Sequence, residues 1–98
     1  MDPRPPAIGL IETQGFTAVF AAIDAATKTA DVSVLGKEKL GGGYITVLLA
    51  CDTAAVEAAV VAASARVDGM GTLIAAHVIT APSDAVMGLI PAASIPDA

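Results

Sequence analysis

The sequence has few charged residues and very few aromatic ones. Charged residues make up 15% of the 98 positions and aromatic residues 3%, whereas hydrophobic residues make up 55%. A single domain of this size has little interior in which to bury such a surplus. The surplus therefore favours contacts with a membrane or with other subunits.

The sequence also lacks a long hydrophobic run. The longest stretch without Asp, Glu, Lys or Arg extends from Gly69 to Ser83 and contains Pro82, whereas a membrane-spanning helix needs about 20 mainly apolar residues. The first six residues include an acid and three prolines, so we expect no signal peptide. The apolar surplus therefore predicts an oligomer and no membrane partner.

Basic residues and cysteines are scarce as well. Lys and Arg number 5 against 10 Asp and Glu, and the formal net charge is -5. Nucleic-acid-binding domains normally carry a basic surface, so this charge argues against a nucleic-acid partner. The single cysteine, Cys51, has no intrachain disulfide partner, which is typical of a cytoplasmic protein.

The residue types that carry enzyme chemistry are nearly absent. His77 is the single histidine and lies in a predicted strand, where we interpret it as packed or interfacial. Cys51 is interpreted as a small buried residue, and no serine has a nucleophile-elbow context. One His and one Cys give no metal-ligand spacing. The sequence predicts a protein that is not an enzyme and has no catalytic, cofactor-binding or metal site.

The hydrophobic pattern predicts six main elements and a short final helix. The predicted strands and helices, in order, are a strand over 7–13, a helix over 16–29, a strand from 32, a strand over 44–50, a helix from 53 to about 68, a strand over 72–79 and a short helix within 83–90. Asp52 or Thr53 is the expected N-cap of the second helix. The order βαββαβ predicts an α+β, ferredoxin-like fold: a four-stranded antiparallel sheet with both main helices on one face.

Apolar spacing predicts one face for each main helix. In both predicted helices, apolar residues recur every three or four positions. The predicted faces are Phe16, Val19, Phe20, Ile23 and Ala26 in the first helix, and Val56, Val60, Ala63 and Val67 in the second.

Three consecutive glycines, Gly41 to Gly43, stand between a charged run at 37–39 and the strand that begins at Tyr44. Walker and dinucleotide phosphate loops lead into a helix, so a following strand argues against both. A two-residue hairpin needs only two glycines, and each glycine has an entropic cost. A hairpin turn is the simplest interpretation, and close approach of another backbone is the alternative.

Four segments, in the right order and at the right spacing, resemble the hexamer-forming shell proteins of bacterial microcompartments that contain a single BMC domain. These segments are AIGLIETQGF at 7–16, DAATKTA at 24–30, EKLGGG at 38–43 and AHVI at 76–79. The resemblance runs from Ala7 to about Pro82. It implies a structural shell tile with a short C-terminal helix after the βαββαβ domain.

The resemblance also implies a central pore in a ring of six subunits. The segment similar to the family's pore consists of Lys39, Leu40, Gly41, Gly42 and Gly43. Many family members have Ser where Gly42 stands, so a wider, less hydrogen-bonding pore for small polar metabolites is expected.

Three further residues match hexamer-edge positions of the family. Lys28 is the residue through which hexamers would tile, and Asp31 stands where a neighbouring edge residue would lie. Where an arginine is usual after the final strand, this chain has Ala81. The resemblance implies as partners other copies of the chain, other shell proteins, encapsulated enzymes and small metabolites.

The predicted domain organisation is a flexible arm over 1–6, the BMC-like domain over 7–90 and a flexible tail over 91–98. A second hypothesis remains beside the shell tile. In it the chain is a small ferredoxin-like regulatory protein that binds a nucleotide or phosphate at the glycine loop.

Overall fold

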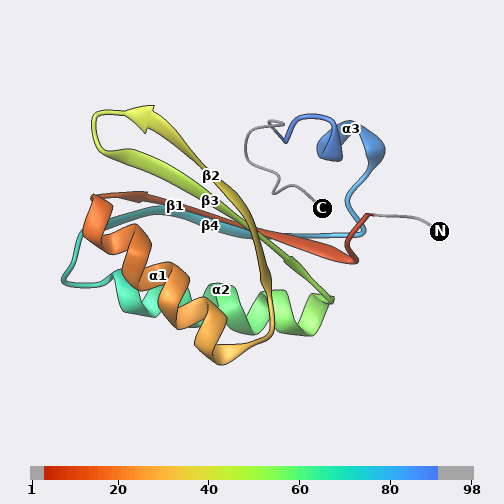
Figure 1. Ribbon diagram of the computed structural model, residues 1–98, viewed down its shortest axis with the longest axis horizontal. Coiled ribbons are helices and arrows are strands. Elements are labelled where there is room, and N and C mark those ends of the chain that lie inside the picture. Colours follow the sequence, from red (N-terminus) through yellow and green to blue (C-terminus); the bar gives the residue numbers. More distant parts are fainter. Residues whose placement is uncertain (1–3, 91–98) are drawn as a thin grey trace.

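A computed structural model describes residues 4–90 and contains the predicted order of elements (Figure 1). The elements are β1 (Ala7–Gln14), α1 (Phe16–Thr29), β2 (Ser33–Gly41), β3 (Tyr44–Cys51), α2 (Thr53–Val67), β4 (Thr72–Thr80) and α3 (Asp84–Met87). The predicted tail at 91–98 and the first three residues of the predicted arm lie outside the described residues.

The four strands form one antiparallel sheet in the order β2-β3-β1-β4. Figure 1 shows α1 and α2 side by side on one face of this sheet and α3 on the other face. The α+β ferredoxin-like fold predicted from the sequence is confirmed. Both edge strands, β2 and β4, come from the ends of their αβ units, as this topology requires.

The strand register shows which residues lie together at each end of the sheet. At one end, Gln14 of β1 pairs with Tyr44 of β3 and Thr72 of β4. At the other, Ala7 of β1 pairs with Cys51 and Thr80. The first end contains the β2–β3 turn and is called the turn end, and the second is called the far end.

The main core lies between the sheet and the two long helices. Its fully buried members include Ile11 of β1, Leu49 of β3 and Val56 of α2. The predicted stripe of α2 is confirmed, since Val56, Val60, Ala63 and Val67 are all buried. Alanines at 18, 22, 26, 59 and 63 are also buried, which lets the helices approach the sheet and each other closely.

The predicted face of α1 is wrong at its two aromatic residues. Val19 and Ala26 are buried as expected, but Phe16 and Phe20 are 48% and 54% exposed. The buried face is centred instead on Ala18, Val19, Ala22 and Ala26. Periodicity predicts an apolar arc on a helix, but the neighbouring elements decide which part of that arc is buried, and α1 packs mainly against α2.

The start of α2 and the turn before β4 have clear local causes. The Asp52 side chain accepts a hydrogen bond from the Ala55 amide at 2.8 Å, so Asp52 is the N-cap. Before β4, a Cβ atom on Gly71 would lie 2.5 Å from the Gln14 carbonyl oxygen and 2.8 Å from the Ala18 Cβ. Glycine at this position is therefore required by close packing at the turn end.

Candidate functional site

The glycine run forms the tip of the β2–β3 hairpin. Gly42 and Gly43 have φ angles of 62° and 84°, and Gly41 before them has 89°. Two consecutive positive φ angles in a two-residue turn match the type I′ hairpin, whose twist suits the flanking strands. A register shift between Lys39 and Gly41 adds a bulge. The hairpin interpretation is confirmed, and all three glycines occupy backbone conformations that other residues rarely adopt.

The turn is anchored to the junction between β1 and α1. The Gly15 amide donates to the Gly43 carbonyl at 3.0 Å, and Gln14 Nε2 donates to the Gly42 carbonyl at 3.3 Å. In the sequence, Gln14 and Gly15 were noted only as part of the family-like segment at 7–16, with no contact to the glycine turn. Their role was missed because a contact across 28 positions has no local sequence signal.

Little else of the described chain approaches the turn. A Cβ atom on Gly41 would meet nothing within 4 Å, and one on Gly42 would lie 3.5 Å from the Tyr44 ring. Close approach of another backbone is therefore not the reason for glycine within one subunit. The positive φ angles are sufficient.

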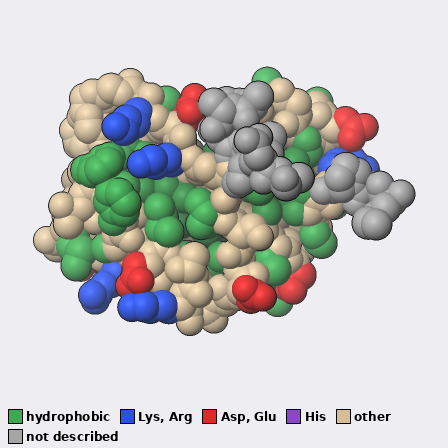
Figure 2. Space-filling view, in the orientation of Figure 1, with side chains coloured by type: hydrophobic (Ala, Val, Ile, Leu, Met, Phe, Trp, Pro, Cys, Tyr) green, Lys and Arg blue, Asp and Glu red, His purple; other side chains and the backbone are tan. Residues whose placement is uncertain are grey.

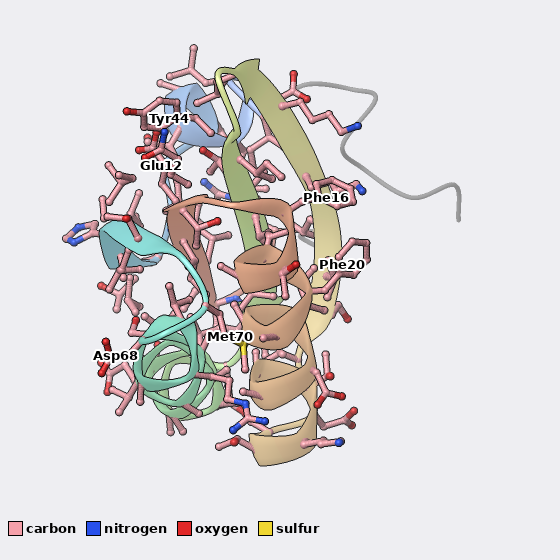
Figure 3. All side chains as sticks on the ribbon, turned by 90° about the vertical axis from the view of Figure 1, so that its left-hand side faces the viewer. Glu12, Phe16, Phe20, Tyr44, Asp68 and Met70 are labelled. Carbon is pink, nitrogen blue, oxygen red and sulfur yellow. The ribbon has the colours of Figure 1, made fainter. Side chains whose placement is uncertain are left out.

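The side chains at the base of the turn point away from its tip. Lys39 Nζ lies 5.1 Å from the centre of the Phe16 ring, and Lys37 Nζ lies 5.1 and 5.4 Å from the rings of Phe16 and Phe20. The two rings contact each other edge to face at 5.0 Å. Figure 3 shows both phenylalanines on the α1–β2 side of the molecule, and Figure 2 shows Lys or Arg side chains next to hydrophobic surface near the turn end. Leu40 is 58% exposed.

The three edge candidates gather at the far end of the sheet. Lys28 lies in the last turn of α1, which starts at the turn end and runs back along the sheet. The carbonyl of Asp31 accepts a hydrogen bond from Cys51 Sγ at 3.4 Å, so Asp31 lies beside the last residue of β3. Ala81 follows Thr80, which pairs with Ala7. The structure thus separates the pore candidates from the edge candidates along one sheet.

Lys28 and Ala81 have distinct local environments. Lys28 Nζ lies 3.0 Å from Asp24 Oδ2 in an exposed pair one helical turn apart. Ala81 has a φ of 46°, which costs a residue with a Cβ atom about 1–2 kcal/mol. Its amide donates to the Pro6 carbonyl at 2.8 Å, which holds this conformation in place.

The two residues considered for chemistry, His77 and Cys51, lie on different strands. His77 is exposed on β4, and Cys51 is half-buried and not fully buried as interpreted from the sequence. Within residues 4–90, no three His, Cys, Asp or Glu side chains are grouped to hold a metal ion. No helix of that same part of the chain has the length and apolarity to cross a membrane.

Comparison with known families identifies the family to which the chain belongs. A BMC domain matches residues 7–82. The chain belongs to the BMC-domain family. It is 47% identical over 77 residues to the carboxysome shell protein CsoS1 of Prochlorococcus marinus, covering 78% of this chain and 75% of that one.

Other BMC-domain relatives agree with this assignment. The chain is 41% identical over 85 residues to the microcompartment shell protein PduA of Salmonella typhimurium, covering 87% of this chain and 90% of the relative. A solved microcompartment protein from Desulfitobacterium hafniense superposes with a TM-score of 0.69 at 27% identity. That match covers 76% of this chain but 40% of the other, so the BMC-domain chain spans less than half of that protein. The resemblance drawn from the four sequence segments is confirmed.

Proposed function

We propose that this BMC-domain protein is a structural tile of a bacterial microcompartment shell in the cytoplasm. It forms a cyclic homohexamer with a central pore, and hexamers pack edge to edge into a shell facet. The observation that carries the proposal is the separation of the glycine turn and the edge candidates to opposite ends of one sheet. A ring with turn ends inward gathers six glycine turns at its axis and six far ends at its perimeter.

Each lateral side of the subunit offers apolar surface for such a ring. On the α1–β2 side, Phe16 and Phe20 are about half exposed. On the opposite side, edge strand β4 exposes 39% of Leu73 and 43% of Ile74. A cyclic ring joins two different surfaces of neighbouring subunits. Both surfaces lie toward the turn end, because Phe16 follows Gly15 and β4 begins there, so their contact would direct the turns to the axis.

Charge supports the same pairing. Lys37 and Lys39 lie over the phenylalanine rings on the α1–β2 side. Asp68, at the C-terminus of α2, lies on the opposite side in Figure 3 and is exposed. Opposite charges on two surfaces favour their association and oppose contact of either surface with itself.

The pore would be lined by backbone. Lys39 is drawn sideways over Phe16, and the carbonyls of Gly42 and Gly43 accept hydrogen bonds within the subunit. Engaged carbonyls present less negative potential to the axis, and positive-φ turns favour anion-binding concavities. Such an opening suits small polar or anionic metabolites. The tile needs no catalytic residues, and its partners would be other shell proteins and encapsulated enzymes.

Native mass spectrometry of the full chain tests the ring. We expect six copies of the 9.6 kDa subunit. The lateral surfaces are tested by Phe16→Asp/Phe20→Asp and by Leu73→Asp/Ile74→Asp. Each variant alone should be monomeric, and a mixture of the two should give a dimer through its single intact interface.

The control is Leu89→Asp, because Leu89 is 81% exposed on the other face of the sheet. That variant should remain hexameric. A monomeric or trimeric wild-type chain would overturn the proposed function. If both double variants remained hexameric, the proposal of a ring would stand. Only the assignment of its lateral surfaces would be overturned.

A further inference from the structure

The face of the sheet opposite α1 and α2 has its own small cover. The segment formed by α3 and residues 88–90 lies over this face, where Ile90 packs with Ile8, Leu48 and Ala50 in a second apolar cluster. All of this cover follows residue 82, where the BMC-domain match ends. It therefore lies outside the segment that matches the BMC domain.

One corner of the cover is fastened by the N-terminal arm. Arg4 Nη1 lies 3.0 Å from Asp84 Oδ1, in the first turn of α3. The same nitrogen donates to the Pro82 carbonyl at 3.4 Å. Next to this contact, the Ala81 amide donates to the Pro6 carbonyl. The arm thus contacts the segment that connects β4 to α3 at Ala81 and Pro82, and α3 itself at Asp84.

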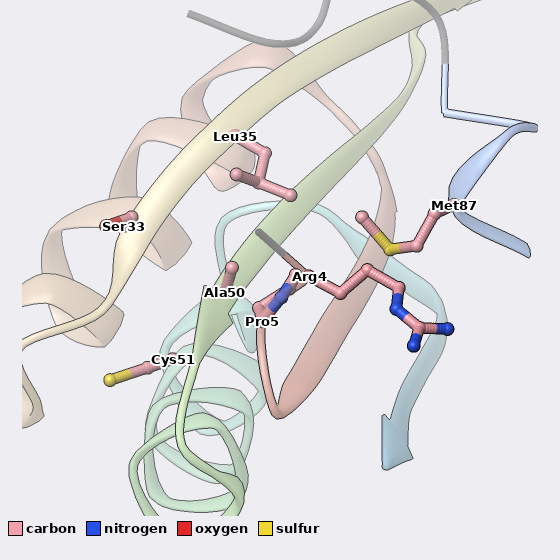
Figure 4. Close-up of a pocket in the computed structure, with 7 residues that line it drawn as sticks. All are labelled: Arg4, Pro5, Ser33, Leu35, Ala50, Cys51 and Met87. Carbon is pink, nitrogen blue, oxygen red and sulfur yellow. The ribbon is translucent and has the colours of Figure 1, made fainter. Parts of the chain in front are cut away.

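The rest of the cover is loosely packed. A cavity of about 610 Å³ separates the arm and Met87 of α3 from Leu35 and Ala50 of the sheet (Figure 4). A second cavity of about 370 Å³ lies between the cover and the outer ends of Leu10 and Leu48. Beside these open pockets, the cover contacts the apolar cluster of the sheet through Val86, Met87 and Ile90.

We propose that Arg4 and Asp84 form an ionic latch, and that opening the latch releases α3 as a lid from the apolar face of the sheet. The ion pair is exposed, with side-chain accessibilities of 38% and 92%. Exposed ion pairs contribute little to stability and weaken as salt rises. The latch therefore opens without unfolding of the main core, which lies on the other side of the sheet.

Hydrogen exchange measured by mass spectrometry on the full, assembled chain tests the lid. The reporters are the amides of residues 86–90, which hydrogen-bond within the cover. Arg4→Ala should accelerate their exchange roughly two- to five-fold, as expected for loss of an exposed ion pair. The fluorescence of 8-anilinonaphthalene-1-sulfonate should rise as the apolar face is uncovered.

The charge-exchanged variant Arg4→Asp/Asp84→Arg should restore slow exchange, and salt should accelerate exchange in the wild type but not in Arg4→Ala. Asp24→Asn is the matched control, since it breaks an ion pair of the same 3.0 Å length on α1. Unchanged exchange in Arg4→Ala overturns the latch. The latch is also overturned if hydrogen exchange is faster in Arg4→Ala but salt does not accelerate it in the wild type and the charge-exchanged variant does not slow it. In that case packing of the arm, and not the ion pair, would hold α3. The outcome does not depend on whether the chain forms hexamers.

Discussion

The turn end and the far end of the sheet differ in the atoms that they present. At the turn end, three glycines with positive φ expose backbone atoms without side chains. Gln14 and Gly15 hold this backbone in place by donating hydrogen bonds to its carbonyls. At the far end, the candidates Lys28, Asp31 and Ala81 carry side chains and lie outside the strands. Substitutions should therefore change folding stability at the first end and assembly at the second.

The largest effect is expected for Gly71→Ala at the turn end. The new Cβ atom would lie 2.5 Å from the Gln14 carbonyl oxygen, so backbone must move to admit it. Overpacking of this kind costs about 1–3 kcal/mol, measured as the free energy of unfolding in urea. Gly69→Ala is the comparison for backbone strain without a clash, because its surroundings are open but its φ is 82°, and it should lose about 1–2 kcal/mol. Equal stability of Gly71→Ala and wild type would show that the contact is not tight.

A smaller effect is expected at the tip of the turn. Gly42 has a φ of 62°, so Gly42→Val should lose about 1–2 kcal/mol. Gly42→Asn should lose less, because Asn tolerates this conformation. Both variants should remain hexameric by native mass spectrometry, with a narrower opening by electron microscopy. If the Asn variant dissociated into subunits, the turn would take part in the contacts between subunits. That result would contradict the prediction that the turn lies at the axis, outside the lateral surfaces.

At the far end, Ala81→Arg should change assembly with little change in stability. Ala already bears the cost of its φ of 46°, and Arg is not branched at Cβ, so the free energy of unfolding should stay within about 0.5 kcal/mol. Electron microscopy should show more extended sheets or tubes. Ala81→Gln, of similar length without charge, should assemble like the wild type. Identical assembly of the Arg variant would argue against an edge position.

The smallest change in stability is expected for Lys28→Ala. Loss of the exposed pair with Asp24 should cost about 0.3–0.5 kcal/mol, while tiling of intact hexamers should be lost. Asp24→Asn removes the same ion pair but keeps Lys28, so its sheets should persist. Loss of sheets in both variants would assign the effect to the ion pair and not to an edge contact.

Local signals predicted most of the fold. The helix over Phe16–Thr29 and the cap at Asp52 were available from spacing and capping chemistry. β2 extends through Lys37, Glu38 and Lys39 to Gly41, beyond its β-branched start. An edge strand with one exposed side has weaker demands on its side chains, so its hydrophobic pattern ends before the strand does.

Contacts between distant segments were not available in the same way. The exposure of Phe16 and Phe20 depends on where α2 packs, and the turn's anchoring depends on Gln14, 28 positions from Gly42. The contact of Arg4 with Asp84 joins the two ends of the described chain. The pore and edge candidates came from resemblance to a family. What the structure adds is their separation along the sheet.

The central strand β1 has a further consequence for a wall built from such rings. Its eight residues, at about 3.3 Å each, span roughly 26 Å, which in the proposed ring would be the distance from the hole to the perimeter. In the proposed wall, strand length would therefore set the lattice spacing and the number of holes per unit area. Inserting one residue in β1 alone would turn its following side chains to the opposite face. The porosity of the wall would thus change only through matched insertions of residue pairs in β1, β3 and β4.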